Sequence, residues 1–330
     1  PLQLLKMTCF DLYLFSYKSL LYLWILVYIL IEGCLLRTHL EIIIVTSLTQ
    51  FDKKLPEQSL YKNPKTGITT SYRMRKYSGT AEHDPIVFLH GFNGNSRSWA
   101  FQFDFFTDRA VIAINAPGFG RSDVIEGGMS VIADEVAATI TALVTTPVVI
   151  IGHSMGGMLA QVLAVSHSDV VRALVLSCTH TGNANAADVP LNAAVQQRLG
   201  QRSEMDDATY GSLRVSAMLP GIAENEMFAF LADIAGEITY EGIRCGGLAM
   251  HHLDTRPLLP RIALPTCIIK AANDTVVSAE KGAALEHGIS SATISVLQNV
   301  GHAPYCEDPE AFNIAISSFL ASLSGPGDLS

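Results

Sequence analysis

Residues 150–157 read Ile150-Ile151-Gly152-His153-Ser154-Met155-Gly156-Gly157. They join a short apolar run, residues 148–152, to a stretch of helical periodicity that begins at Met155. This pattern predicts a buried strand that turns sharply into a helix, with Ser154 at the turn. Glycines on both sides of the serine let the strand and the helix approach closely, because a side chain there would collide with the opposite element. The serine hydroxyl is then expected above the sheet, at the positive end of the following helix.

The same strand-then-helix pattern recurs along the chain from residue 60 onward. Strands are expected at residues 86–90, 111–115, 148–152, 173–177, 266–270 and 293–297, and helices at residues 96–106, 130–144, 155–166, 279–287 and 309–323. Ser130 has the residue type of a helix N-cap, and residues 69–77 are expected to add an antiparallel edge strand. The alternation predicts an α/β fold with a doubly wound, mostly parallel sheet.

One interval, residues 181–261, breaks the alternation. It contains only helical pattern, at residues 191–199, 207–218 and 224–234. Such an insertion is too long for an ordinary connection, so we expect a helical cap over the C-terminal edge of the sheet, where open α/β sheets bind ligands. The expected organisation is an N-terminal extension (residues 1–55), a core (residues 56–180 and 262–330) and a cap (residues 181–261).

An exposed serine is a poor nucleophile without a base. A candidate base and a candidate acid both occur later in the chain. His302 follows the last expected strand, and Asp274 follows the strand expected at residues 266–270. The acid could instead follow the strand at residues 173–177, but residues 177–180 contain no carboxylate. The order Ser154, Asp274, His302 is therefore the predicted order of nucleophile, acid and histidine.

Acyl transfer also needs two backbone N–H groups aimed at the developing negative charge, an arrangement called the oxyanion hole. Met155, next to the serine, is expected to supply one N–H group. The loop after the first parallel strand, residues 90–94, is expected to supply the other from Phe92, because Gly91 lets that loop turn close to Ser154.

Over residues 60–323, the chain resembles the α/β-hydrolase superfamily. The resemblance is carried by the residues above together with His90-Gly91-Phe92 and Asn115-Ala116-Pro117-Gly118-Phe119-Gly120-Arg121-Ser122. Within this superfamily, the chain is similar to the small esterases and 3-oxoadipate enol-lactonase-type enzymes, which carry a helical cap and use no cofactor. The resemblance implies a serine hydrolase that cleaves a carboxylic ester or lactone through an acyl-enzyme. Ser154 would attack, His302 would transfer the proton and Asp274 would orient the imidazole.

Two alternatives stay open. Carbon–carbon hydrolases of the meta-cleavage-product type also resemble the chain, although they often have Asn before the nucleophile and Trp after the histidine, where this chain has His153 and Ala303. Some members of the superfamily only bind ligands, and a cap over a pocket would serve that use. Ser154 excludes the chemistry of haloalkane dehalogenases and epoxide hydrolases, which use an aspartate nucleophile. The His-Gly-Gly-Gly loop of the hormone-sensitive-lipase-like branch is absent from the sequence.

Composition narrows the expected partners. The formal net charge of -9 disfavours contact with nucleic-acid backbones, so a small-molecule ester or lactone is the expected partner. The six cysteines form no CxxC pair, and reduced, buried thiols are expected. His251, His252 and Asp254 lack further ligands nearby, so we expect a solvated or ion-paired segment there and neither a metal nor a cofactor. Pocket or core positions are expected for Trp99, Phe119, Met129, Met218 and Phe228.

The first fifty residues differ chemically from the rest. Residues 12–36 are mostly apolar, but the uninterrupted run at residues 20–31 is shorter than the roughly 20 residues of a membrane span. Three interpretations apply: a membrane anchor at residues 12–36, a cleaved leader, or a stretch outside the functional protein. The expected location is the cytoplasm, or a membrane if residues 12–36 are an anchor.

Overall fold

The computed structural model describes residues 51–79 and 83–323. The predictions for residues 1–50, including the apolar run at 12–36, lie outside these residues. Within the described ranges, no helix has both the length and the apolar character that crossing a bilayer requires.

An eight-stranded sheet forms the centre of the fold, with strand order β1-β2-β4-β3-β5-β6-β7-β8. The strands are β1 (Gln58–Lys62), β2 (Thr69–Arg75), β3 (Ile86–Leu89), β4 (Val111–Ile114), β5 (Val148–His153), β6 (Val171–Ser177), β7 (Thr266–Ala271) and β8 (Ala292–Leu297). The pairs β1–β2 and β2–β4 are antiparallel, and all other pairs are parallel. The central strands β3, β4 and β5 are buried along their whole length, which explains their continuous apolar sequence. The predicted doubly wound, mostly parallel sheet is confirmed.

The antiparallel end of the sheet differs from the prediction. The strand expected at residues 69–77 exists as β2, but it is not the edge, because β1 pairs with its outer side. Strand β1 has a polar sequence, QSLYK, and an exposed surface, so it carries no apolar pattern that could reveal it. The turn into β2 uses Gly67 at a φ of 77°, in the left-handed region that glycine tolerates.

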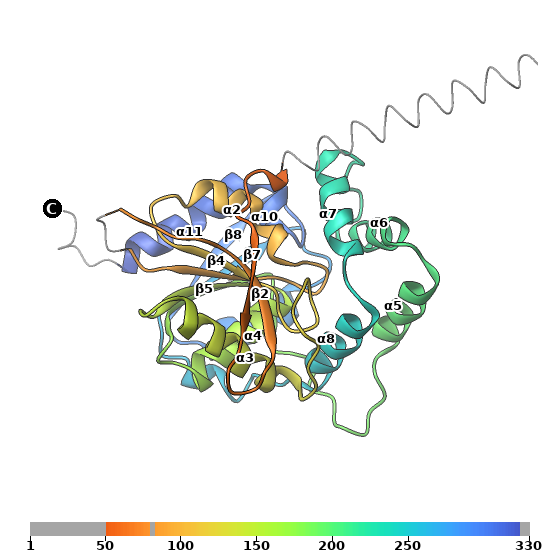
Figure 1. Cartoon of the computed structure of the whole chain (residues 1–330), viewed down its shortest axis with the longest axis horizontal. Coiled ribbons are helices and arrows are strands. Elements are labelled where there is room, and N and C mark those ends of the chain that lie inside the picture. The colour runs from red at the N-terminus through yellow and green to blue at the C-terminus, as the bar shows by residue number, and fades with distance from the viewer. Residues whose placement is uncertain (1–50, 80–82, 324–330) are drawn as a thin grey trace, which may run out of the picture. The chain divides into compact units, whose positions relative to one another are not determined.

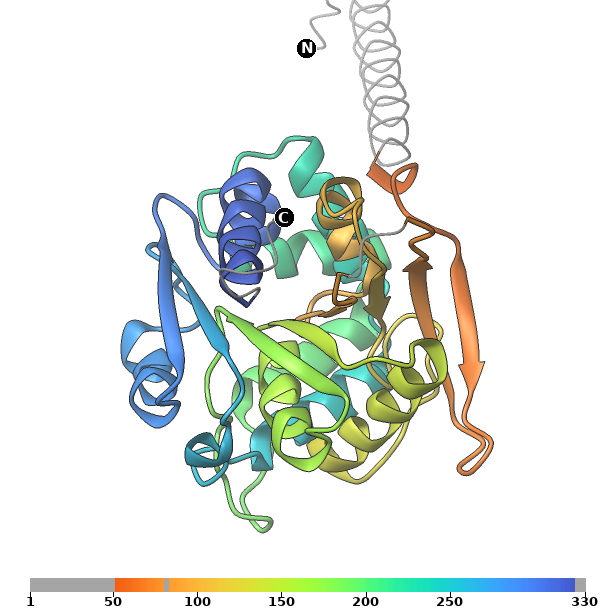
Figure 2. The same ribbon diagram turned by 90° about the vertical axis from the view of Figure 1, so that its left-hand side faces the viewer.

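Helices cover both faces of the sheet (Figures 1 and 2). One apolar core joins the sheet to α3 (Gly128–Leu143), α4 (Met155–Ser166) and α9 (Ala279–Gly288), and a second joins the opposite face to α2 (Ala100–Phe105) and α11 (Pro309–Leu323). A 3₁₀ turn, η1 (Ser96–Trp99), precedes α2, and the short α10 (Pro304–Glu307) precedes α11. Ser130 is not an N-cap, because α3 begins two residues earlier, at Gly128. Gly127 is the N-cap, and the φ values of 115° at Gly127 and 78° at Gly128 form the turn into the helix.

Four helices are inserted between β6 and β7, followed by the 3₁₀ turn η2 (Leu259–Arg261). They are α5 (Ala193–Glu204), α6 (Asp207–Met218), α7 (Glu226–Gly236) and α8 (Tyr240–His252), and they lie together on one side of the sheet (green to teal in Figure 1). We call them the inserted helices. Three were predicted, whereas α8 was not, since its sequence contains three glycines. Those glycines have a packing role: a Cβ at Gly242 would lie 2.3 Å from the carbonyl oxygen of Gly118.

Residues 51–55 fall within the extension expected at residues 1–55, and Phe51 and Asp52 contact the folded body. The ring of Phe51 lies 4.8 Å from that of Phe230 and 5.5 Å from that of Phe101, measured between centroids. Asp52 forms a 2.8 Å ion pair with Arg97.

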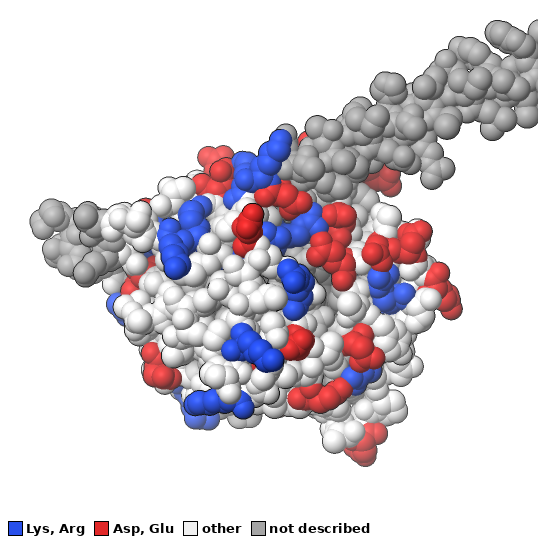
Figure 3. Space-filling model, in the orientation of Figure 1, with Lys and Arg blue, Asp and Glu red and all other residues white. Residues whose placement is uncertain are grey.

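Charged side chains of both signs are interspersed on the face shown in Figure 3, and acidic ones are more numerous over the inserted helices at the right. Four cysteines, Cys178, Cys245, Cys267 and Cys306, are free and buried, as expected, and the other two lie outside the described residues.

Candidate active site

Ser154 occupies a strained turn between β5 and α4. Its φ of 52° and ψ of -115° lie outside the backbone conformations that residues with a side chain normally adopt. Its N–H group donates to Ser177 O at 2.9 Å. A Cβ at Gly152 would lie 2.4 Å from Gly156 O, and one at Gly156 would lie 2.1 Å from Leu89 O. The flanking positions therefore admit only glycine, as the sequence motif predicts, and the turn holds Ser154 at the C-terminal end of the sheet.

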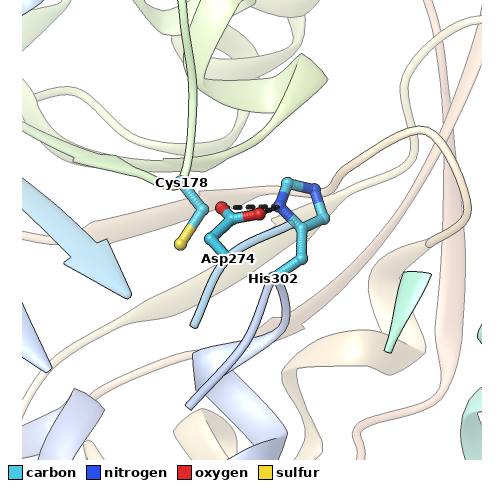
Figure 4. A group of neighbouring side chains, drawn as sticks. All are labelled: Cys178, Asp274 and His302. Carbon is cyan, nitrogen blue, oxygen red and sulfur yellow. Dashed lines mark hydrogen bonds and ion pairs between the residues drawn. The ribbon is translucent and has the colours of Figure 1, made fainter. Parts of the chain in front are cut away.

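His302 lies between Ser154 and Asp274. Its Nε2 atom is 3.1 Å from Ser154 Oγ, and its Nδ1 atom is 2.9 Å and 3.1 Å from the two Asp274 carboxylate oxygens. Figure 4 shows the imidazole and the carboxylate facing each other, with Cys178 beside them. Since an ionised carboxylate only accepts hydrogen bonds, Nδ1 carries a proton and Nε2 is free to accept the serine proton. The three residues that the sequence singled out are thus in contact.

Asp274 is fixed by its own backbone as well as by His302. One of its carboxylate oxygens accepts hydrogen bonds from Val276 N at 2.8 Å and Val277 N at 2.9 Å, in a turn after β7. Burial by itself raises the pKa of Asp274, but the hydrogen bond and charge of His302 and the two backbone N–H groups outweigh it, so the pKa lies below its ordinary value. The carboxylate is therefore ionised beside the imidazole.

The loop that carries His302 is held by two groups that the sequence analysis missed. Glu307 in α10 accepts hydrogen bonds from Gly301 N at 2.8 Å and Ala303 N at 2.9 Å, the backbone neighbours of His302. His153 Nε2 lies 2.6 Å from the carbonyl oxygen of His302 and donates to it. Burial, followed by the charge of His302, lowers the pKa of His153 to about 3, which keeps this ring neutral. The only feature of the sequence that pointed to the role of Glu307 is the position of a carboxylate five residues after a histidine expected in a loop.

The two predicted oxyanion donors come from separate elements of the fold. Phe92 lines the same cavity as Ser154, and Met155 is the first residue of α4. Within residues 51–79 and 83–323, neither backbone N–H group donates a hydrogen bond. The loop passes close to the serine because Gly91 has no side chain: a Cβ there would lie 3.2 Å from the Cβ of Ser154.

A cavity of about 210 Å³ opens over Ser154 and His302. It lies between the sheet edge and the inserted helices, which contribute Val195, Met218 and Met250. Of the five apolar residues considered for the pocket, only Met218 lines this cavity. Trp99 is instead a core residue, stacked on Phe88 with ring centroids 4.6 Å apart.

One group of potential metal ligands occurs in the part of the chain that the structure describes: Cys178, Asp274 and His302. The carboxylate of this group already binds His302 and two backbone N–H groups, so its geometry is that of an acid and a histidine in a hydrogen-bond chain. His251 is buried and contacts Asn185, against the expected solvated segment, whereas Asp254 is ion-paired with Arg256 at 2.7 Å.

The chain belongs to the alpha/beta hydrolase family, whose family model matches residues 86–315. It is similar to several named enzymes. A pimeloyl-[acyl-carrier protein] methyl ester esterase of Neisseria meningitidis is 26% identical over 246 residues, covering 71% of this chain and 93% of that protein. The 3-oxoadipate enol-lactonase 2 of Acinetobacter baylyi is 25% identical over 249 residues, covering 73% of this chain and 90% of that protein.

Solved structures share the fold. The enol-lactonase of Burkholderia xenovorans LB400 superposes with a TM-score of 0.70 at 19% identity, over 80% of this chain and 100% of that one. The resemblance that the sequence indicated is therefore confirmed, and the protein is a hydrolase of this fold.

Proposed function

We propose that this protein is a cofactor-free serine hydrolase that cleaves a carboxylic ester or lactone through an acyl-enzyme. The observation that carries the proposal is the chain of contacts from Ser154 Oγ to His302 Nε2, at 3.1 Å, and from His302 Nδ1 to Asp274, at 2.9 Å. A serine that contacts a histidine, which in turn contacts a carboxylate, is the activated nucleophile of acyl transfer. The esterase and lactonase names of the relatives support the same class of substrate.

The proton follows the hydrogen bonds. As Ser154 Oγ attacks the carbonyl carbon, its proton passes to His302 Nε2, and the resulting imidazolium is stabilised by Asp274. His302 then gives this proton to the departing alcohol oxygen, which leaves the acyl group on Ser154. A water molecule attacks the acyl-enzyme while His302 takes one of its protons, and the acid departs as Ser154 regains a proton.

The developing negative charge needs donors that no other group occupies. The N–H groups of Phe92 and Met155 fill this role, since Met155 directly follows Ser154, Phe92 lines the cavity that contains Ser154, and neither N–H group is hydrogen-bonded within the described residues. We further propose that residues 181–261, which contain the inserted helices, act as a cap that shapes the acyl site through Met218 and Met250. Shortening Met250 to Ala is expected to extend the accepted acyl length.

A fluorophosphonate reagent tests the proposal directly, because it forms a covalent bond only with an activated serine. The wild-type chain and the control Ser130→Ala, altered at an exposed serine of α3, are expected to label, and Ser154→Ala is not. Short-chain p-nitrophenyl esters should be hydrolysed, with a rate that falls by about 10³-fold or more in Ser154→Ala and His302→Ala. Unchanged rates in both variants would refute the mechanism.

The two alternatives predict different outcomes. A carbon–carbon hydrolase would turn over a vinylogous diketone and leave the simple esters and enol-lactones intact. A ligand-binding member with an inert serine would neither label nor turn over any of these compounds. Measuring all three substrate classes with one preparation separates the three functions.

A further inference from the structure

The charged side chains that line the active-site cavity have one sign. Arg198 from α5 and Lys281 from α9 both line it, and no Asp or Glu does so among the described residues. This is unexpected in a chain with a formal net charge of -9. The side chains that line the cavity beside Ser154 therefore carry a net positive charge, in contrast to the chain as a whole.

Arg198 is held in place without an acidic partner. Its Nη1 atom donates to Asn93 Oδ1 at 3.2 Å, and its guanidinium carbon lies 5.1 Å above the centre of the Phe92 ring. Among residues 51–79 and 83–323, no carboxylate pairs with it and no second hydrogen bond uses its other donors. Both contacts orient the guanidinium over the loop that carries the predicted oxyanion donor Phe92.

The surroundings of Arg198 disfavour its charge in the absence of an anion. Burial, followed by the charge of Arg214, lowers the pKa of Arg198 to about 10. The neighbouring Arg202 has a carboxylate partner, Asp207, so an unpaired guanidinium is not a general feature of α5. A partly buried cation with unused donors in a cavity is a site that an anionic group would stabilise.

We propose that Arg198, assisted by Lys281, forms a carboxylate subsite in the cavity beside Ser154. The substrate is then an ester or lactone whose non-reacting end carries a carboxylate, which the planar fork of Arg198 binds through two parallel hydrogen bonds. This inference rests on the proposed serine hydrolase function and narrows its substrate class. In this proposal Arg198 determines substrate specificity, whereas Ser154 and His302 cleave the bond.

Paired substrates test the subsite. Monomethyl adipate is compared with the analogue in which a neutral carboxamide of nearly equal size replaces the free carboxylate. Wild-type protein is expected to prefer the carboxylate by about tenfold or more in kcat/KM. Arg198→Gln should lower kcat/KM for the carboxylate by about 10- to 100-fold, mainly through KM, and leave the carboxamide within about twofold. Lys281→Gln should have a smaller effect, because Lys281 is exposed.

A matched control removes the same charge elsewhere. Arg256→Gln alters an exposed arginine that pairs with Asp254 outside the cavity, so it should leave both substrates unaffected. Equal losses on both substrates in Arg198→Gln would make Arg198 a structural tether of α5 and would overturn the subsite. A wild-type protein without preference for the carboxylate would overturn it as well.

A second measurement needs neither turnover nor a variant. Adipate is expected to slow the fluorophosphonate labelling of Ser154 in the wild-type protein, and adipamide is not. Equal protection by both compounds, or by neither, would refute the subsite, and protection by inorganic phosphate but not by adipate would overturn the carboxylate assignment. Normal labelling with no carboxylate preference refutes the subsite alone, whereas absence of labelling and of turnover refutes the proposed function.

Discussion

The carboxylate of Glu307 accepts hydrogen bonds from the residues on both sides of His302. The N–H groups of Gly301 and Ala303 lie 2.8 Å and 2.9 Å from its two oxygens. The imidazole is thus aimed at Ser154 by a clamp on its backbone in addition to the contact with Asp274. Glu307 is not among the residues that line the cavity over Ser154, so its role is to position His302.

Replacing Glu307 by Ala is expected to lower kcat by about 10- to 100-fold with little change in KM. The two N–H groups lose their acceptors, the loop relaxes, and the 3.1 Å contact between His302 Nε2 and Ser154 Oγ lengthens. Glu307→Gln keeps one acceptor oxygen and should recover part of the rate. The labelling rate with fluorophosphonate should fall in parallel, which a purely structural role would not cause.

The matched control for this prediction is Glu310→Gln, which alters an exposed carboxylate at the start of α11 and should behave as wild type. If the folded fraction of Glu307→Ala keeps full kcat and full labelling rate, the positioning role is refuted.

Asp274→Asn is expected to reduce kcat by about 10³- to 10⁴-fold while the protein stays folded. An amide N–H group in place of a carboxylate oxygen favours the His302 tautomer with an unprotonated Nδ1, and the proton then occupies Nε2, where it blocks the acceptance of the serine proton. Steady-state kinetics with a p-nitrophenyl ester, together with circular dichroism of the variant, checks this. A variant that retains a tenth or more of the wild-type rate would contradict it.

The residues that define the chemistry were readable in the sequence because their positions carry strong local signals. A serine between glycines requires one type of turn, and Asp274 and His302 each follow an apolar strand at its carboxyl end. The residues that support them were not readable. Glu307 acts through backbone N–H groups across a loop, and Arg198 faces the cavity only because α5 packs over residues 90–94, a contact that helical periodicity does not determine.

The same distinction applies to the fold. The buried strands could be predicted because an apolar run indicates burial on both faces of a sheet. Strand β1 could not be predicted because it is polar and exposed. Helix α8 could not be predicted because its glycines favour close packing more than helix formation. Ser130 was assigned as an N-cap from residue type alone, although Gly127 and Gly128 start the helix through their positive φ values.

Gly156→Ala is expected to destabilise the protein by about 1–3 kcal/mol and to lower activity. The added Cβ would lie 2.1 Å from Leu89 O and 2.8 Å from His90 O, and backbone atoms of a central strand cannot move aside without displacing the loop of Phe92. Urea unfolding measures the free energy. Gly200→Ala is the matched control, since nothing lies within 4 Å of its Cβ in α5, and it should stabilise by about 0.5–1 kcal/mol. Equal effects of the two substitutions would refute the packing argument.

Two buried histidines are expected to make the fold sensitive to mild acid. Burial lowers the pKa of His90 to about 4, and burial with the charge of His302 lowers that of His153 to about 3, from an ordinary value of 6.5. Below pH 6.5 the unfolded chain binds protons at these rings and the folded chain does not. The free energy of unfolding should therefore fall as the pH decreases from 6.5, by up to about 1.4 kcal/mol per pH unit for each ring, and level off below the folded pKa values.

His153→Gln isolates the second of these rings. Gln keeps a donor for the carbonyl oxygen of His302 but does not titrate, so the pH dependence of the urea midpoint should become shallower in this variant. His287→Gln, at an exposed histidine of α9, should leave the slope unchanged. If stability is constant between pH 6.5 and about pH 5, or if His153→Gln keeps the wild-type slope, then His153 takes up its proton at the same pH in the folded and the unfolded chain, which would contradict a buried, neutral ring that donates to the His302 carbonyl oxygen.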